Sequence, residues 1–113
     1  MSSALIKGNI ARISDIREYD DGGTKTLYVT VIDNHQRSDG NGGYIDAGKT
    51  VYDVSFRNGM ADRVHQSFAV GHTVLIEAEA VRASLTTANG ETNPVMKARG
   101  IDIGRSPRYA AFR

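Results

Sequence analysis

Arginine is the side chain in this sequence with the clearest capacity for chemistry. Its guanidinium can hold a phosphate and also stack on a ring, which lysine cannot do. The 113 residues contain fourteen Lys plus Arg against thirteen Asp plus Glu, a formal net charge of +1, so charge alone neither requires nor excludes a polyanionic partner. The basic residues are scattered and form no basic arm, so surface charge is the simpler interpretation of each one alone. Besides the C-terminal Arg113, the arginines are Arg12, Arg17, Arg37, Arg57, Arg63, Arg82, Arg99, Arg105 and Arg108.

Residues suited to catalysis or metal binding are few. The chain has no cysteine, which excludes disulfides, thiolate metal sites and thiol catalysis. His35, His65 and His72 are too far apart for the spacing of a metal-binding pair. Glu77 and Glu79 share one outward face of an expected strand, where solvated carboxylates are the simpler interpretation. No glycine-rich phosphate loop is present, and we expect no enzymatic activity, no metal and no cofactor.

The side chains of segment 50–57, TVYDVSFR, alternate between two faces of an expected strand. Only the set that lies outside the core can face a ligand. Tyr52 and Phe56 belong to the apolar set, whereas Asp53 and Arg57 belong to the opposite set together with Val51 and Ser55. Burying the second set would place two charges in the core, so we expect the two aromatic rings inside and Arg57 outside. A buried Tyr52 would also need a hydrogen-bond partner for its hydroxyl.

Other segments predict the elements around this strand. Alternation or apolar spacing predicts strands over 4–16, 24–33, 72–83 and 95–104, with a bulge or bend at Gly8 and with Ala80 buried. Residues 60, 64 and 68 are apolar and spaced by four, which predicts a helix with Asn58 as N-cap, Asp62 in its first turn and Gly71 as C-cap. Segment 37–49 is expected to be a mobile loop. Segment 86–94 is expected to be a loop containing an Asn89-Gly90 turn.

Three strands, a helix and two more strands follow the order of the OB-fold, a five-stranded Greek-key barrel with one short helix between its third and fourth strands. Other small β-barrels with one helix also fit the pattern. We expect an all-β fold with one domain over residues 1–104 and a short tail over residues 105–113. No stretch resembles a secretory signal or is long enough to span a bilayer, so we expect a soluble, cytoplasmic protein without a membrane partner.

Three segments resemble bacterial single-stranded DNA-binding proteins in the right order and spacing. IKGNIARISDIR at 6–17 resembles the opening strand of that family, and MADRVHQSFAVGHTVLIEAE at 60–79 resembles its helix-and-strand block. DIGRSPRYA at 102–110 is similar to the end of the core domain in actinobacterial members. The resemblance implies an OB-fold that coats single-stranded DNA without sequence specificity in replication, recombination or repair, associated with the nucleoid. It also implies a homotetramer, although a dimer is equally compatible with the residues.

The sequence departs from the family at the positions where bases stack on aromatic rings. Alignment places His35, Val51, Arg57 and Leu85 at these four positions, and none is Trp, Phe or Tyr. Because each lost stacking contact costs about 1–3 kcal/mol per base, we expect weaker or more salt-sensitive DNA binding than in a Trp-rich relative. The expected contacts are therefore rich in arginine; beyond the four aligned positions they are Arg12, Tyr28, Arg37, Tyr44, Lys49, Arg82, Lys97 and Arg99.

The C-terminal end also departs from the resemblance. Family members usually continue into a linker and an acidic tail that recruits other proteins, whereas this sequence ends in AAFR with no acid after Asp102. We therefore expect no tail-mediated recruitment, which suggests a plasmid-encoded, phage-encoded or paralogous form. The alternative function is a protein-interaction or assembly module of a replication or primosome complex in which DNA binding has weakened or been lost.

Overall fold

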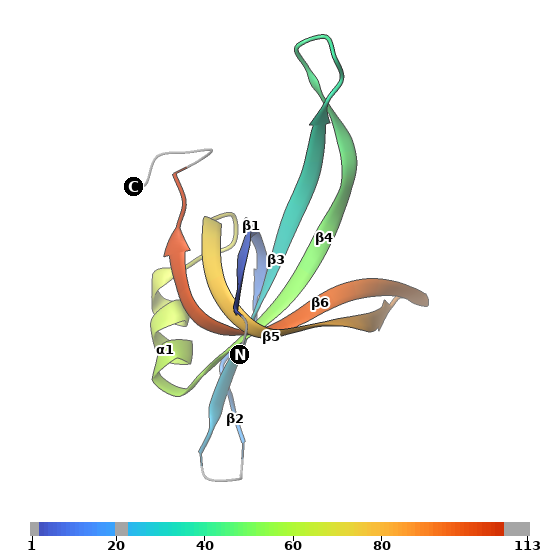
Figure 1. Ribbon diagram of the computed structural model, residues 1–113. Helices are drawn as coiled ribbons and strands as arrows, with labels where there is room; N and C mark the ends of the chain where they lie inside the picture. The colour runs from blue at the N-terminus through green and yellow to red at the C-terminus, as the bar shows by residue number, and fades with distance from the viewer. Residues whose placement is uncertain (1–2, 20–22, 108–113) are drawn as a thin grey trace.

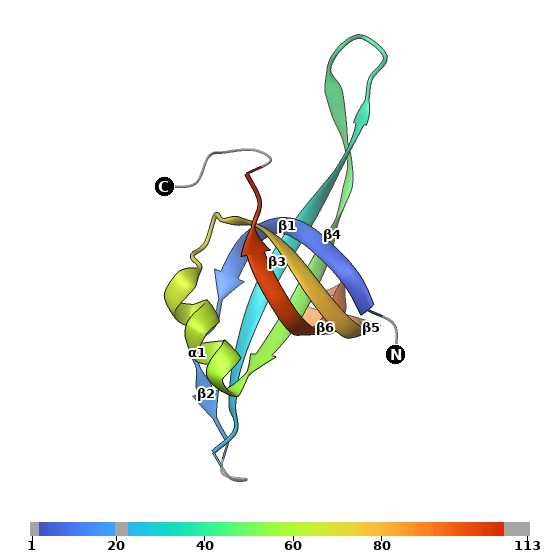
Figure 2. The same ribbon diagram turned by 60° about the vertical axis from the view of Figure 1, so that its left-hand side comes forward.

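The computed structural model describes residues 3–19 and 23–107. In these residues the chain forms a β-barrel with one helix on its side and two long ribbons that project from it (Figures 1 and 2). The elements in chain order are β1 Ser3–Ile13, β2 Arg17–Glu18, β3 Lys25–Ser38, β4 Tyr44–Arg57, α1 Asn58–Ser67, β5 Thr73–Ala88 and β6 Glu91–Arg105.

The barrel closes because β1 pairs with two different strands. Its first part, from Ser3 to Asn9, pairs with β5, and its last part, from Asn9 to Ile13, pairs with β3. The order around the barrel is β1-β5-β6-β4-β3 and back to β1, with β4 and β6 parallel and the other pairs antiparallel. This is the expected OB-fold, with α1 after the third barrel strand. The two-residue strand β2 pairs only with β3 and was not predicted.

The core confirms the predicted orientation of strand β4. Val54 and Phe56 are fully buried, and Tyr52 is half-buried and packs against the same cluster. The ring of Phe56 lies directly over Gly100 of β6, where any Cβ would overlap it. Within the described residues the Tyr52 hydroxyl forms no hydrogen bond with protein, and partial exposure makes the expected buried partner unnecessary.

The two segments that we expected to be loops are mostly strands. β3 and β4 continue their pairing to Ser38 and Tyr44, so the connection is only residues 39–43. β5 and β6 continue to Ala88 and Glu91, joined by Asn89 and Gly90. Both turn residues have positive φ angles, 53° and 79°, which confirms the predicted tight turn. The loop prediction was wrong because a two-stranded ribbon has no buried face, and polar composition therefore does not exclude pairing.

The helix forms where predicted, but its ends differ. α1 begins at Asn58 without a side-chain cap, and the Asn58 Oδ1 instead accepts a hydrogen bond from the Lys25 amide at 3.3 Å. Asp62 lies beyond the first turn and pairs with the Lys25 ammonium at 3.3 Å. The helix ends at Ser67, and Gly71 (φ 96°) instead serves the tight turn from Ala69 to His72.

Two of the register shifts in the described strands change which side chains reach the outer face of the barrel. In β1 the register shifts between Ile10 and Arg12, so the bulge lies three residues after Gly8, where we expected it, and Gly8 itself is regularly paired with Val74. A Cβ at Gly8 would overlap the Ile32 carbonyl oxygen, so this glycine serves the close approach of β1 to β3. In β5 the register shifts between Glu79 and Arg82, and Ala80 takes a φ of 53°. Ala80 is therefore exposed, and its predicted burial was wrong.

Candidate nucleic-acid interface

A row of cross-strand neighbours crosses the outer face of the barrel. Arg12 of β1 lies opposite Thr30 of β3, which lies opposite Asp53 of β4. Asp53 is beside Lys97 of β6, which lies opposite Arg82 of β5. Directly paired residues in a sheet project to the same face, so three cations and one carboxylate form a line across five strands. We call Arg12, Thr30, Asp53, Lys97 and Arg82 the cationic row.

The bulges supply the two ends of the cationic row. Ile10 is buried, and without the extra residue Arg12, two positions further on, would point inward as well. In β5, unbroken pairing from Glu79 and Arg99 would set Val81 against Lys97 and Arg82 against Met96. The bulge instead sets Arg82 against Lys97. Both arginines therefore face outward because each strand carries one residue more than its partner.

A pocket of about 320 Å³ lies at the β1–β3–β4 part of the cationic row. Tyr28, two residues before Thr30 on β3, contributes an aromatic ring to the wall of this pocket. The Ser14 hydroxyl accepts a hydrogen bond from the Tyr28 amide at 2.9 Å and so holds this part of β3 in place. A hydrogen bond with the Tyr19 side chain, followed by burial, raises the pKa of the Tyr28 phenol. The remaining lining residues that bear charge are Arg12, Arg17, Asp53 and Lys97.

Asp53 is the one acid in the cationic row and occupies its middle. Burial raises the pKa of the Asp53 carboxyl above its usual value, and Lys97 and Arg12 act against that rise. In the part of the chain that the structure describes, neither cation is close enough to form an ion pair with this carboxylate, and no hydrogen bond to it is present. The carboxylate oxygens are thus available to an external donor.

Further cations lie in the rows next to the cationic row. Arg57 is the last residue of β4 and lies opposite Thr26 of β3. Thr26 is also paired with Arg17 of β2, on the other side of β3. Arg99 of β6 lies beside Ser55 and forms an ion pair with Glu79 at 3.2 Å, which partly neutralises it. The strand face that we expected to remain for DNA, from Val51 to Arg57, is therefore the middle of a wider basic surface.

Five of the remaining predicted contacts lie on the two ribbons, away from the pocket, whereas Val51 lies beside the cationic row, two residues before Asp53 on β4. On the β3–β4 ribbon, the His35 ring is hydrogen-bonded to the Thr50 hydroxyl at 2.9 Å, and Tyr44 near the tip is 73% exposed. Lys49 is exposed, Val51 is half-buried, and Arg37 lies opposite Ile45, with its side chain outside the described part. On the β5–β6 ribbon, Leu85 is 70% exposed opposite Pro94.

The structure therefore separates the predicted residues into two groups. Arg12, Lys97 and Arg82 lie on the cationic row, and the same outer face carries Tyr28, Val51, Arg57 and Arg99. The ribbon residues do not reach this row. Sequence reasoning omitted Arg17 and Asp53 from the predicted contacts. The available signal for Asp53 was its place in the outward-facing set of β4. No sequence signal predicted the short strand β2, which carries Arg17.

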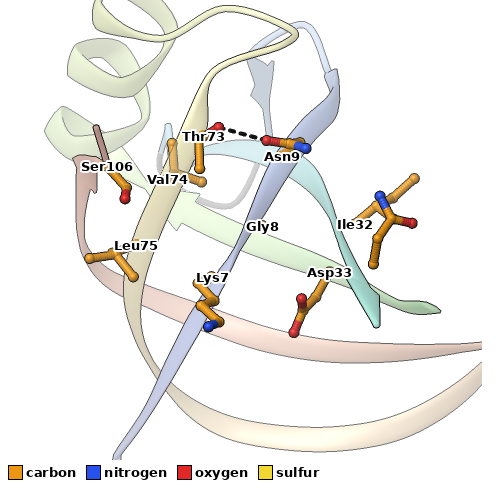
Figure 3. A pocket seen from close by; sticks show the side chains of 10 residues that line it. Lys7, Gly8, Asn9, Ile32, Asp33, Thr73, Val74, Leu75 and Ser106 are labelled. Carbon is orange, nitrogen blue, oxygen red and sulfur yellow. Dashed lines mark hydrogen bonds between the residues drawn. The ribbon is translucent and has the colours of Figure 1, made fainter. Parts of the chain in front are cut away.

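A second pocket, about 440 Å³, lies where β1 separates from β3 (Figure 3). Among the residues that the structure describes, Lys7 is the one basic residue that lines this pocket, and Asp33 of β3 also lines it. The Thr73 hydroxyl donates to Asn9 Oδ1 at 2.7 Å at one side of this pocket. It has no aromatic lining residue and less positive charge than the first pocket, so it is the poorer candidate for a nucleic acid.

Known structures share this fold. The small single-stranded DNA-binding protein from Streptomyces coelicolor superposes with a TM-score of 0.67 at 18% identity, covering 94% of both chains. A Plasmodium falciparum SSB in complex with ssDNA gives 0.66 at 12% identity, with 94% of this chain and 95% of that chain covered. The wild-type single-stranded DNA binding protein from Thermus aquaticus gives 0.65 at 17% identity; this chain is 96% covered and spans 52% of that protein.

These similarities establish the fold. No protein-family model and no curated protein sequence matches the chain. Residues 3–19 and 23–107 contain no group of three His, Asp or Glu side chains arranged to hold a metal ion, and no helix long and apolar enough to cross a membrane.

Proposed function

We propose that this protein binds single-stranded DNA through the cationic row and acts without catalysis, as a member of the single-stranded DNA-binding family. The observation that carries the proposal is the alignment of Arg12, Lys97 and Arg82 along one row of the outer face of an OB-fold, with Tyr28 lining the pocket that Arg12 and Lys97 also line. Cations in a line hold successive phosphates, and an aromatic ring accepts any base by stacking. Binding is accordingly tolerant of sequence and depends on arginine more than on tryptophan.

The two ribbons extend this surface. β3 with β4 and β5 with β6 project from the barrel in different directions (Figure 1). Tyr44 and Leu85 expose apolar surface on them, and Lys49 adds a cation. A strand that crosses the cationic row would continue along the β3–β4 ribbon or along the β5–β6 ribbon. We propose that the ribbons lengthen the contact in this way, and that the role in the cell is replication, recombination or repair.

Fluorescence anisotropy with labelled oligo-dT and with a duplex of the same length tests the proposal. We expect oligo-dT to bind at low salt and the duplex to bind much more weakly, because bases in a duplex are not free to stack on Tyr28. An Arg12→Ala, Lys97→Ala double variant should lose most of this affinity, whereas Arg63→Ala on α1 should retain it. Failure of the wild-type protein to bind oligo-dT at low salt would contradict the proposal and favour the alternative, a protein-interaction module of a replication complex.

We also propose that the protein self-associates through the outer face of β1 and β5. Leu5 and Leu75 project from this face and are 72% and 38% exposed. From Ser3 to Gly8, β1 pairs only with β5 in the described chain, so its other edge is open to a second copy. Light scattering after size exclusion should give a dimer or tetramer for the wild type and a monomer for a Leu5→Glu, Leu75→Glu variant. A wild-type monomer at micromolar concentration would contradict it.

A further inference from the structure

The middle of the cationic row is occupied by an acid, which a purely phosphate-binding surface would not require. Asp53 lies between Arg12, across Thr30, and Lys97, and it lines the pocket that Tyr28 also lines. A carboxylate repels a phosphate, so the backbone of a bound strand must pass beside Asp53 and not over it. What faces the carboxylate is then a base.

The chemistry of the position matches one base edge. A carboxylate accepts hydrogen bonds through two oxygens, and two parallel charge-assisted bonds are stronger and more selective than one. The Watson–Crick edge of guanine presents two adjacent donors, N1–H and the N2 amino group, followed by the O6 acceptor. Thymine presents a single N–H between two carbonyl oxygens, and a carboxylate repels both of these oxygens. A cation beside the carboxylate, as Lys97 and Arg12 are, completes the match by donating to O6.

We infer that Asp53 forms a base-reading subsite that prefers guanine at one position of a bound single strand, with Lys97 or Arg12 donating to the guanine O6. The pocket of about 320 Å³ falls at the lower end of volumes that hold a small molecule, roughly 300–1,000 Å³, which suits one base. The Watson–Crick edge is free only when the strand is unpaired, so the subsite also discriminates against duplex. This inference rests on the proposed binding of single-stranded DNA and adds a preference to an otherwise sequence-tolerant surface.

Base analogues test the subsite on the wild-type protein. Oligo-dT carrying one central guanosine should bind about tenfold more tightly than oligo-dT alone, the ratio expected for a bidentate base contact. Replacing that guanosine by inosine, which lacks the N2 amino group, should remove most of the advantage. Replacing it by 7-deazaguanosine, which keeps the Watson–Crick edge, should preserve it. Equal affinity of the guanosine and inosine strands would overturn the inference.

Variants assign the preference to Asp53. Asp53→Asn should lose the guanine advantage, so that its affinities for the guanosine and inosine strands become equal. Asp102→Asn on β6 makes the same chemical change at an exposed position outside the cationic row and should keep the advantage. Retention of the advantage in folded Asp53→Asn would also overturn the inference. If that variant does not fold, the inosine comparison decides alone.

The inference and the proposed function fail in different ways. Oligo-dT that binds with no gain from guanosine contradicts the subsite and leaves single-strand binding intact. No binding by any single strand contradicts the proposed function itself.

Discussion

Tyr28 and Asp53 are the two side chains that distinguish this surface from a plain arrangement of cations. Tyr28 on β3 and Asp53 on β4 both line the pocket. One offers a ring to any base and the other offers acceptors to a particular edge. Each role predicts a different response to conservative substitution.

Tyr28 should contribute through its ring and not through its hydroxyl. We expect Tyr28→Leu to weaken oligo-dT binding by about 1–3 kcal/mol, since stacking is lost. Tyr28→Phe should bind almost as the wild type does, because the ring remains. Anisotropy titrations of both variants check this. A loss in Tyr28→Phe as large as in Tyr28→Leu would instead assign the contact to the hydroxyl.

Asp53 should lower stability at neutral pH. Its folded-state pKa is raised from the usual value of 3.8 by burial, with Arg12 and Lys97 opposing and the Tyr28 phenol also nearby. The folded protein thus holds the proton more strongly than the unfolded chain, and stability falls as pH rises from 3.8 through the folded-state pKa. We expect Asp53→Asn to be more stable than the wild type at pH 7, with a smaller difference as pH approaches 3.8.

Urea denaturation of both proteins at the two pH values measures this difference. Asp102→Asn serves as the control, since its carboxyl is exposed. An advantage of Asp53→Asn that grows on acidification would show that the carboxylate is stabilised in the fold by its neighbouring cations.

At the scale of elements, the packing of β6 against β4 depends on one small residue. A Cβ at Gly100 would overlap the ring of the fully buried Phe56. We expect Gly100→Ala to destabilise the barrel by about 1–3 kcal/mol, the usual cost of overpacking a core. Gly104→Ala, later on the same strand and with open space around the new methyl group, should change stability far less.

The free energy of unfolding of the two glycine variants is the measurement. In a Phe56→Leu background the cost of Gly100→Ala should shrink, because the ring that the methyl group meets is gone. An unchanged cost in that background would locate the strain in the backbone of β6.

Some elements followed from the sequence and others did not. The strand around Phe56 was predicted correctly because alternation and charge burial agree on a single register. The ribbons were not predicted, since pairing there is decided by the partner strand and not by a buried face. The cationic row was missed as a unit because it joins Arg12, Asp53 and Lys97 from three distant segments, and Arg12 reaches it through a bulge that has no clear sequence signal.

For the whole molecule, the net charge is only +1, so overall charge provides little attraction to DNA. Attraction to DNA then arises from the basic outer face, and its salt dependence reports how many of its cations meet phosphates. We expect the slope of log affinity against log salt to become shallower by about 0.7 for each of Arg12→Ala, Arg82→Ala and Lys97→Ala, the value for one phosphate contact on a single strand.

Arg63→Ala should leave that slope unchanged, because this exposed arginine lies on α1 and outside the cationic row. A slope near zero for the wild type would mean that phosphates contribute little and would contradict the arginine-rich mode of binding.

The bulge at Ala80 has a consequence for saturation mutagenesis of β5. Along an ordinary strand, tolerance to polar replacements alternates with a constant phase. Here Ala78 is buried and Arg82 faces outward although they lie four positions apart, an even number. The alternating profile should therefore invert its phase between these two positions. Moreover, an insertion or deletion of one residue near Ala80 should be more damaging than most substitutions there, because it would exchange the inner and outer surfaces of the strand beyond it.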